Sequence, residues 1–243
     1  MVMRASSCVL VGISRHIERL LPWFWHHLRL HSGIDVVFAD FGMTEKGLLW
    51  CKKRGEILTL PLEEPERKIS KIQRLWFKKP LACSCSSYEK TLWLDIDCEV
   101  RFDVSEIFSL CENPYGIALA KDPAGCMKKT VYDEEEYKMH LAKGVNSGVI
   151  PFLKDTPIIS LWIDELKQNS LLYRGDQDAL SYVVSRLDTP IDKMPQEMNW
   201  LGSMGSNPNA LIYHWHGLEG KSHIVKELEL LQHLGIIEDE LGD

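Results

Sequence analysis

The sequence predicts an α/β protein, a single domain whose mixed, mainly parallel central sheet is flanked by helices. Three observations predict it. The chain has 243 residues, enough for one large domain with a substantial core. Apolar segments of strand length alternate with amphipathic segments of helical spacing from residue 7 onward. Residues 91–94 form an apolar run that leads directly into two carboxylates, and the end of a strand is where open α/β sheets place their ligand sites.

Composition and charge narrow the class of protein. Hydrophobic residues make up 45% of the chain and charged residues 26%, as in ordinary globular proteins. The formal net charge of −7 argues against a nucleic-acid partner. No apolar run approaches the roughly 18 residues of a membrane span, so we expect no transmembrane segment, and we expect no signal peptide. Seven cysteines without a Cys-x-x-Cys pair indicate reduced thiols in a cytoplasmic protein rather than a structural zinc site.

The N-terminal segment predicts a βαβ unit. Residues 7–13 form an apolar strand, and Gly12 near its end would let a ligand approach the backbone closely. Apolar residues then recur at helical spacing, with Pro22 in the first turn. Residues 34–39 form the second strand, and no Gly-x-Gly-x-x-Gly motif joins the two strands, which argues against a Rossmann dinucleotide site. Asp40, just after it, is either a ligand of a nucleobase or ribose or a turn aspartate.

The next segment predicts a helix, a short strand and a basic stretch. Thr44 is placed to cap a helix over residues 45–53, and residues 55–60 form a strand. Residues 61–79 are basic, with aromatic residues interleaved, and are either a solvated helix face or a source of a lysine for a phosphate group. Residues 81–88 continue as helix up to the central strand.

Asp95 and Asp97 follow the central apolar strand directly. If the strand continues through them, both side chains point to the same side, because side chains alternate along a strand. Two carboxylates that close repel unless a cation neutralises them, and hard oxygen ligands suit Mg²⁺ or Mn²⁺. The alternative is that Asp95 begins a loop and Asp97 caps a turn.

The second half of the chain contains further candidate elements. Asp176 and Gln177 open a helix, where they either cap it or bind sugar hydroxyls. Residues 121–143 are charged and irregular, and form either a lid or a surface excursion. His214 follows a short strand and is a candidate third metal ligand. The other expected elements are a helix at 104–108, a strand at 116–120, small polar residues entering a strand at 146–150, a helix at 158–167, a strand at 211–213, and a helix with an acidic tail at 223–243.

Four motifs occur in an order that resembles a known family. They are Leu94-Asp95-Ile96-Asp97, Asn146-Ser147-Gly148-Val149, Asp176-Gln177-Asp178-Ala179-Leu180, and His214-Trp215-His216-Gly217 followed by Lys221. This series is similar to that of the metal-dependent glycosyltransferases of the GT-A fold, and most of all to the retaining, family 8 group with glycogenin and the lipopolysaccharide glucosyl- and galactosyltransferases. The resemblance spans most of the chain and implies a nucleotide-binding half over residues 1–100 and a sugar and acceptor half over residues 101–222.

The resemblance implies a role for each matching residue. Asp95, Asp97 and His214 would hold Mn²⁺, or Mg²⁺, on the diphosphate of a UDP-sugar. Lys79, sixteen residues before Asp95, would contact the donor. The implied donor-binding set also includes Ser147, Gly148, Gly217 and Lys221, beside Gly12 and Asp40. The implied catalytic residues are Asp176, Gln177 and Asn146, with Asp176 the nearest candidate for a nucleophile.

The C-terminal motif departs from the family pattern. Lys221 comes one residue late, and Ser222-His223 replaces the usual Pro-Trp. These differences put the phosphate contact of Lys221 in question and leave His216 as a rival metal ligand.

The activity implied is transfer of a hexose, from UDP-glucose or UDP-galactose, to a hydroxyl of a carbohydrate, lipid-linked glycan or protein acceptor. A sugar nucleotidyltransferase is one alternative, although the glycine-rich basic loop usual after its first strand is poorly matched here. A non-catalytic nucleotide-sugar or carbohydrate-binding module is the other.

Overall fold

A mixed sheet forms the centre of the computed structural model, which describes residues 6–61, 75–122, 135, 144–173, 175–191, 193–238 and 240–241. Its strand order is β3-β2-β1-β4-β6, and the pairs β1–β2, β2–β3 and β1–β4 are parallel. Only β6 runs antiparallel, along β4. The strands are β1 (Ser7–Ile13), β2 (Asp35–Asp40), β3 (Glu56–Thr59), β4 (Lys90–Leu94) and β6 (Val149–Leu153).

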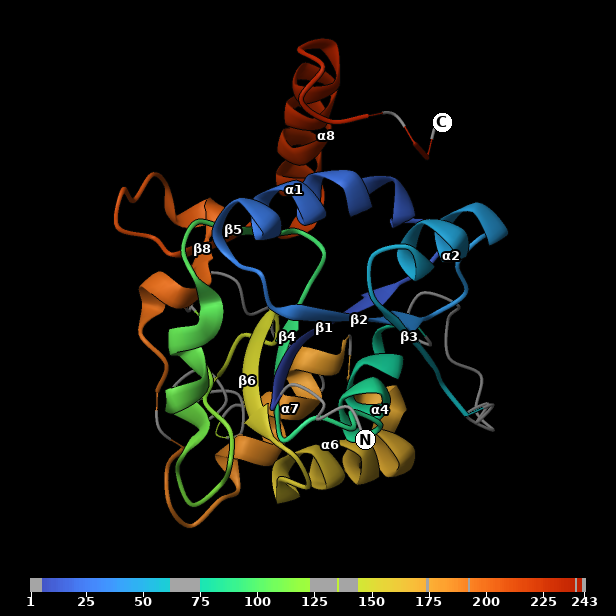
Figure 1. The fold of residues 1–243 in the computed structure, drawn as a ribbon. Coiled ribbons are helices and arrows are strands. Elements are labelled where there is room, and N and C mark those ends of the chain that lie inside the picture. The colour runs from blue at the N-terminus through green and yellow to red at the C-terminus, as the bar shows by residue number, and fades with distance from the viewer. Residues whose placement is uncertain are drawn as a thin grey trace.

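Helices cover both faces of this sheet (Figure 1). One face carries α1 (Leu21–His31) and α2 (Glu45–Lys52). The opposite face carries α4 (Lys78–Ser84), α6 (Pro157–Asn169) and α7 (Asp176–Ser185). The last helix, α8 (Gly217–His233), packs against α1 and projects away from the body of the domain. The 3-10 turns are η1 (Glu18–Leu20), η2 (Val104–Cys111), η3 (Ser170–Leu172), η4 (Gln196–Asn199) and η5 (Gly202–Met204).

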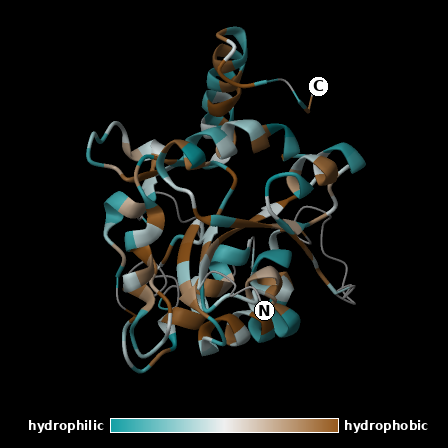
Figure 2. Ribbon diagram, in the orientation of Figure 1, coloured by the Kyte–Doolittle hydropathy of each residue, from teal (hydrophilic) through white to brown (hydrophobic). Residues whose placement is uncertain are grey.

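The sheet separates two hydrophobic cores. Alternate residues of each strand point to opposite faces, so Val9 and Val11 join the core under α1, while Leu10 joins the core under α6. On the neighbouring strand β4, Leu92 joins the core under α1 and Trp93 joins the core under α6. The central strands are accordingly apolar along nearly their whole length (Figure 2), as expected of a sheet buried on both faces.

Most predicted elements of the N-terminal half are confirmed. The first strand has the expected bounds, Ser7–Ile13, and Pro22 lies in the first turn of α1. Thr44 caps α2, because its side chain accepts a hydrogen bond from the backbone N–H of Gly47. The six described cysteines are free thiols. Within the described segments, no helix is long and apolar enough to cross a membrane.

Four predictions of secondary structure were wrong or incomplete. Residues 116–120 make only isolated β-bridges, of Ile117 with Phe152 in β6 and of Leu119 with Lys193, instead of a continuous strand. Helix α4 ends at Ser84 rather than reaching residue 88. Helix α8 begins at Gly217, six residues earlier than predicted. A second sheet, of order β5-β8-β7, was not predicted; its strands are β5 (Cys98–Val100), β8 (Ile212–His214) and β7 (Trp200–Leu201). Most of the basic segment and of the 121–143 segment lie outside the described residues.

Candidate active site

A cavity of about 820 Å³ opens where the strands β1, β2 and β4 end. Its walls come from the segments that follow these strands and from the N-terminal ends of α7 and α8. The carboxyl ends of the parallel strands therefore face the cavity, which is the usual position of a ligand site in an open α/β sheet.

Asp95 and Asp97 lie in a turn at the floor of this cavity, and not on a strand as their spacing suggested. Strand β4 ends at Leu94, and the N–H of Cys98 then donates to the carbonyl of Asp95 at 3.0 Å. Cys98 begins β5, where it pairs with His214 at the end of β8. The two acids and the histidine thus meet through a tight turn and the pairing of β5 with β8. Their ligand atoms all lie within 4.8 Å of one another.

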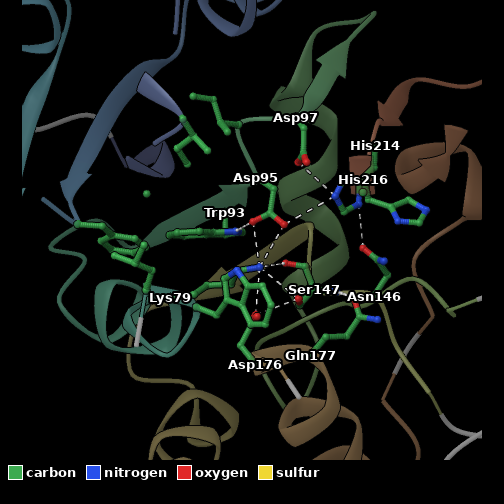
Figure 3. Close-up of a pocket in the computed structure, with 18 of the residues that line it drawn as sticks. Lys79, Trp93, Asp95, Asp97, Asn146, Ser147, Asp176, Gln177, His214 and His216 are labelled. Carbon is green, nitrogen blue, oxygen red and sulfur yellow. Dashed lines mark hydrogen bonds and ion pairs between the residues drawn. The ribbon is translucent and has the colours of Figure 1, made fainter. Parts of the chain in front are cut away.

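The hydrogen bonds around His214 suit this group to a divalent metal ion (Figure 3). Its Nδ1 lies 3.1 Å from Oδ1 of Asn146, an oxygen that already accepts the N–H of Gly148 at 2.9 Å. Because an amide oxygen can only accept, Nδ1 carries a proton. The other nitrogen, Nε2, faces Oδ1 of Asp97 at 3.3 Å and Oδ2 of Asp95 at 3.7 Å. Only a proton or a cation relieves the repulsion between that nitrogen and two carboxylates, and a metal ion would use all three as ligands.

Lys221 supplies positive charge on the other side of Asp97. Its Nζ donates to Oδ2 of Asp97 at 2.8 Å, although it stands one residue later than the family motif expects. Burial alone would raise the pKa of Asp97, but the hydrogen bond and charge of His214 and the charge of Lys221 hold this pKa well below its usual value. Asp97 therefore remains an anion, the form that a metal ion binds.

Lys79 is the second cation of the site and, unlike Lys221, it is buried. Only 6% of it is exposed, and its Nζ lies 2.9 Å from Oδ1 of Asp95 and 3.1 Å from Oδ2 of Asp176. It also donates to the carbonyl and Oγ of Ser147, at 3.1 and 3.2 Å. Burial tends to lower the pKa of Lys79, but the two carboxylates outweigh burial and raise this pKa above its usual value. Lys79 therefore holds together the metal-ligand end and the α7 end of the cavity.

The predicted sugar-binding residues form a connected network at the start of α7. Oγ of Ser147 donates to Oδ2 of Asp176 at 3.1 Å, and the N–H of Ser147 donates to Oε1 of Gln177 at 3.1 Å. Asn146 points elsewhere, because its oxygen contacts His214 and accepts from Asn199 at 3.0 Å. Asp176 and Gln177 are thus fixed beside the cavity, whereas Asn146 positions the histidine.

Three other predicted residues have contacts that differ from those expected. The space above Gly12 is filled by Phe41 and Trp93, since a Cβ on Gly12 would lie 2.4 and 2.8 Å from their rings. Oδ1 of Asp40 accepts the N–H groups of two following residues, each at 2.8 Å, as a turn aspartate does. Asp40 is not among the described residues that line the cavity. A Cβ on Gly148 would lie 2.1 Å from the His214 ring, so this glycine makes room for the histidine.

The geometry favours His214 over His216 as the third ligand. Nε2 of His216 lies 3.1 Å from Oγ of Ser203, so that nitrogen already has a polar partner. Gly217 lines the cavity in a left-handed conformation, with φ +78°, and opens α8. The N-terminal end of this helix, which carries a partial positive charge, therefore borders the cavity.

The architecture and this site can be compared with those of known proteins. No protein-family model matches the sequence, and no curated protein matches it either. Solved structures do match. The bifunctional glycosyltransferase WbbM superposes with a TM-score of 0.67 at 13% identity, over 90% of this chain and 47% of WbbM. The galactosyltransferase LgtC, solved with donor and acceptor sugar analogues, superposes with a TM-score of 0.61 at 16% identity, over 93% of this chain and 95% of LgtC.

A third match is mouse xyloside xylosyltransferase 1, with a TM-score of 0.58 and 14% identity over 86% of this chain and 97% of that one. The chain has the GT-A fold. It spans about half the length of WbbM, at 47%, but nearly the whole of LgtC, at 95%.

Sequence reasoning missed one buried acid of this GT-A domain. Asp122 is 0% exposed and lines the cavity. Its Oδ2 accepts from Nε2 of Gln177 at 2.8 Å, whereas its Oδ1 has no hydrogen-bond partner among the described residues. Asp122 lies at the start of a charged, irregular segment and belongs to none of the four motifs. The only local signal was its position two residues after the apolar run 117–120, with Lys121 between them.

The buried carboxyl group of Asp122 should also make the stability of the fold depend on pH. Burial and the charge of Asp178 raise the pKa of Asp122 to about 7, against the opposing effects of His214 and Gln177. Because this folded-state pKa exceeds the unfolded value, stability is expected to fall as pH rises towards and through 7. We expect Asp122→Asn to reduce the loss of unfolding free energy between about pH 5.5 and about pH 8 by roughly 1–3 kcal/mol. Urea unfolding of the wild type and of the variant at both pH values measures this loss of unfolding free energy. The exposed Asp188→Asn is the control, and an equal effect of both variants would contradict the assignment.

Proposed function

We propose that this chain is a glycosyltransferase that moves a hexose from a UDP-sugar, UDP-glucose or UDP-galactose, to an acceptor hydroxyl. The observation that carries the proposal is the group formed by Asp95, Asp97 and His214, whose ligand atoms converge on the floor of a large cavity. The matching GT-A structures support it, since those proteins are named as glycosyltransferases.

The donor diphosphate would lie between the acids and α8. Asp95, Asp97 and His214 would hold Mn²⁺, or Mg²⁺, and the metal ion would act as a Lewis acid on the diphosphate leaving group. The leaving group gains negative charge as the sugar–phosphate bond breaks. Lys221 and the N-terminal end of α8 at Gly217 are placed to stabilise that charge, because both border the cavity beside Asp97.

The sugar ring would lie against the start of α7. Asp176 and Gln177 both line the cavity and are held in place by Ser147, and Gln177 is held by Asp122 as well. We propose that they bind the hydroxyls of the donor sugar beside the reacting carbon and that the configuration at that carbon is retained. The carboxylate of Asp176 is held by Lys79, which weakens it as a nucleophile. The acceptor would be a carbohydrate, a lipid-linked glycan or a protein hydroxyl.

The first test is calorimetric titration of UDP with and without Mn²⁺, followed by assays of UDP-glucose and UDP-galactose hydrolysis in the absence of acceptor. We expect UDP to bind only with the metal, and one of the two sugars to be hydrolysed slowly. Absence of UDP binding under both conditions would contradict the UDP-donor assignment. Metal-dependent binding without any turnover would instead favour a binding module.

Gln177→Ala separates catalysis from binding. Gln177 contacts Ser147 and Asp122 rather than the metal-ligand group. We therefore expect the variant to lower the hydrolysis rate by about 10-fold or more while UDP affinity changes little. Gln168→Ala, on the neighbouring helix α6 and outside the cavity, is the matched control. An unchanged rate in Gln177→Ala would remove this residue from the sugar site.

A further inference from the structure

A second group of metal-binding side chains lies outside the cavity. Glu99 is on β5, and His223 and Glu227 are one turn apart on α8. Their ligand atoms also lie within 4.8 Å of one another. None of the three lines the cavity. His27, on the facing helix α1, has its Nε2 3.4 Å from Oε1 of Glu227, at the edge of this group.

The nitrogen of His27 is the observation that points to a ligand. The residue is 9% exposed, and its Nε2 is buried and makes no hydrogen bond with the described residues, although Oε1 of Glu227 lies 3.4 Å away. A buried ring nitrogen left unpaired is costly. A metal ion between His27 and Glu227 would satisfy it, since imidazole nitrogen is a preferred ligand of the later transition metals.

Hydrogen bonds fix the orientation of the carboxylates of Glu99 and Glu227, as is usual for carboxylates that bind a metal ion. An indole N–H donates to each of them, from Trp23 to Oε2 of Glu227 at 2.9 Å and from Trp215 to Oε2 of Glu99 at 2.8 Å. Such outer contacts fix the orientation of ligating carboxylates. The ring of Trp215 also stacks on His223, with 3.9 Å between ring centroids, and so orients that ligand.

The balance of charge favours a cation at this place. Glu99 is 7% exposed and pairs with Arg101 through Oε1 at 2.6 Å, whereas Glu227 contacts only histidines and an indole among the ionic and hydrogen-bond contacts of the described residues. A partly buried carboxylate facing two imidazoles and a second carboxylate is a site where a divalent ion lowers the electrostatic energy. The imidazole of His223, 48% exposed, leaves a path for the ion to enter.

We propose that Glu99, His223 and Glu227 form a structural metal site for Zn²⁺, and that His27 turns its Nε2 onto the ion as the fourth ligand. Two nitrogen and two oxygen ligands match a tetrahedral zinc site. The ion would join β5, α1 and α8. Gly217 and Lys221, in the N-terminal part of α8, line the cavity. The metal ion would therefore fix the position of this part of the helix relative to the rest of the domain.

Zinc binding by purified, chelator-stripped protein tests the proposal. The measurement is made in the Asp97→Ala variant, so that the group in the cavity does not compete. Bound zinc is counted after dialysis against ZnCl₂, and thermal unfolding is followed with and without zinc. We expect one bound equivalent and a higher Tm with zinc, because a ligand that binds only the folded state stabilises it.

Adding His223→Gln, and separately Glu227→Gln, to Asp97→Ala should abolish both effects. His223 is half exposed, so its substitution should leave the fold intact, which circular dichroism verifies. His233→Gln and Glu229→Gln, exposed positions on the same helix, are the matched controls and should keep the bound zinc. Absence of zinc in Asp97→Ala protein, or zinc retained after His223→Gln and Glu227→Gln, would overturn the proposal. The result does not depend on whether the chain transfers a sugar.

Discussion

Asp97→Ala is expected to lower the rate of sugar transfer by at least ~10²–10³, because it removes a metal ligand and the anion that faces His214 and Lys221. The fold should survive the change. The side chain of Lys221 is 40% exposed and can turn to water, and His214 keeps its contacts with Asn146 and Asp95. The loss of transfer rate should therefore result from weaker metal binding and not from unfolding of the domain.

The measurement is the Mn²⁺ dependence of UDP binding and of UDP-sugar turnover, with circular dichroism to verify folding. Asp97→Asn keeps the shape of the side chain and should be nearly as inactive, which would assign the loss to charge. Asp164→Ala, at an exposed position on α6, is the matched control and should behave as wild type. Normal turnover by folded Asp97→Ala would exclude Asp97 as a metal ligand.

The site shows what spacing along a sequence can and cannot predict. Asp95 and Asp97 were expected to share one side of a strand, yet they lie in a turn after β4. Their convergence with His214 depends on the pairing of β5 with β8, which joins residues more than a hundred positions apart. Hydrophobic periodicity reports local burial and contains no information on such pairing. The meeting of these three residues was therefore expected, but the turn and the strand pairing that bring them together were not.

The residues that sequence reasoning missed have structural partners distant in the chain. Asp122 contacts Gln177, and Asn199 contacts Asn146, each across more than fifty positions. Neither lies in a motif. Gly12 was expected to let a ligand approach the end of the first strand, and it lines the cavity. Asp40 was expected either to bind a nucleobase or ribose or to hold a turn, and position after a strand does not decide between the two. Phe41 and Trp93 fill the space at Gly12, and local backbone groups bind Asp40.

Secondary structure was predicted best where burial was strongest. Strand β1 is buried along nearly all its length, and its bounds were predicted correctly. Residues 116–120 are just as apolar but make only isolated bridges, one of them to Phe152 in β6, so an apolar run beside a strand does not by itself form a continuous strand. Helix α8 was predicted to begin too late, because the His-Trp-His-Gly motif was interpreted as a set of ligands and not as the start of a helix at Gly217.

Gly148→Ala is expected to inactivate the site without removing any functional group. A methyl group at this position would lie 2.1 Å from Cε1 and 2.3 Å from Nδ1 of His214, far inside van der Waals contact. The His214 ring cannot easily move aside, because it is buried and hydrogen-bonded to Asn146. We expect the ring to leave its position facing Asp97, with transfer reduced ~100-fold or more and folding destabilised by about 1–3 kcal/mol.

Gly33→Ala is the control for the effect of alanine itself, because a Cβ at Gly33 would meet no atom within 4 Å. UDP binding in the presence of Mn²⁺ and the free energy of unfolding are measured for both variants. A double-mutant cycle then tests the steric cause. In a His214→Ala background the clash no longer exists, so adding Gly148→Ala should cost little further stability, although activity stays low. If Gly148→Ala destabilises both backgrounds equally, the glycine is needed for its backbone and not for the space it leaves to the histidine.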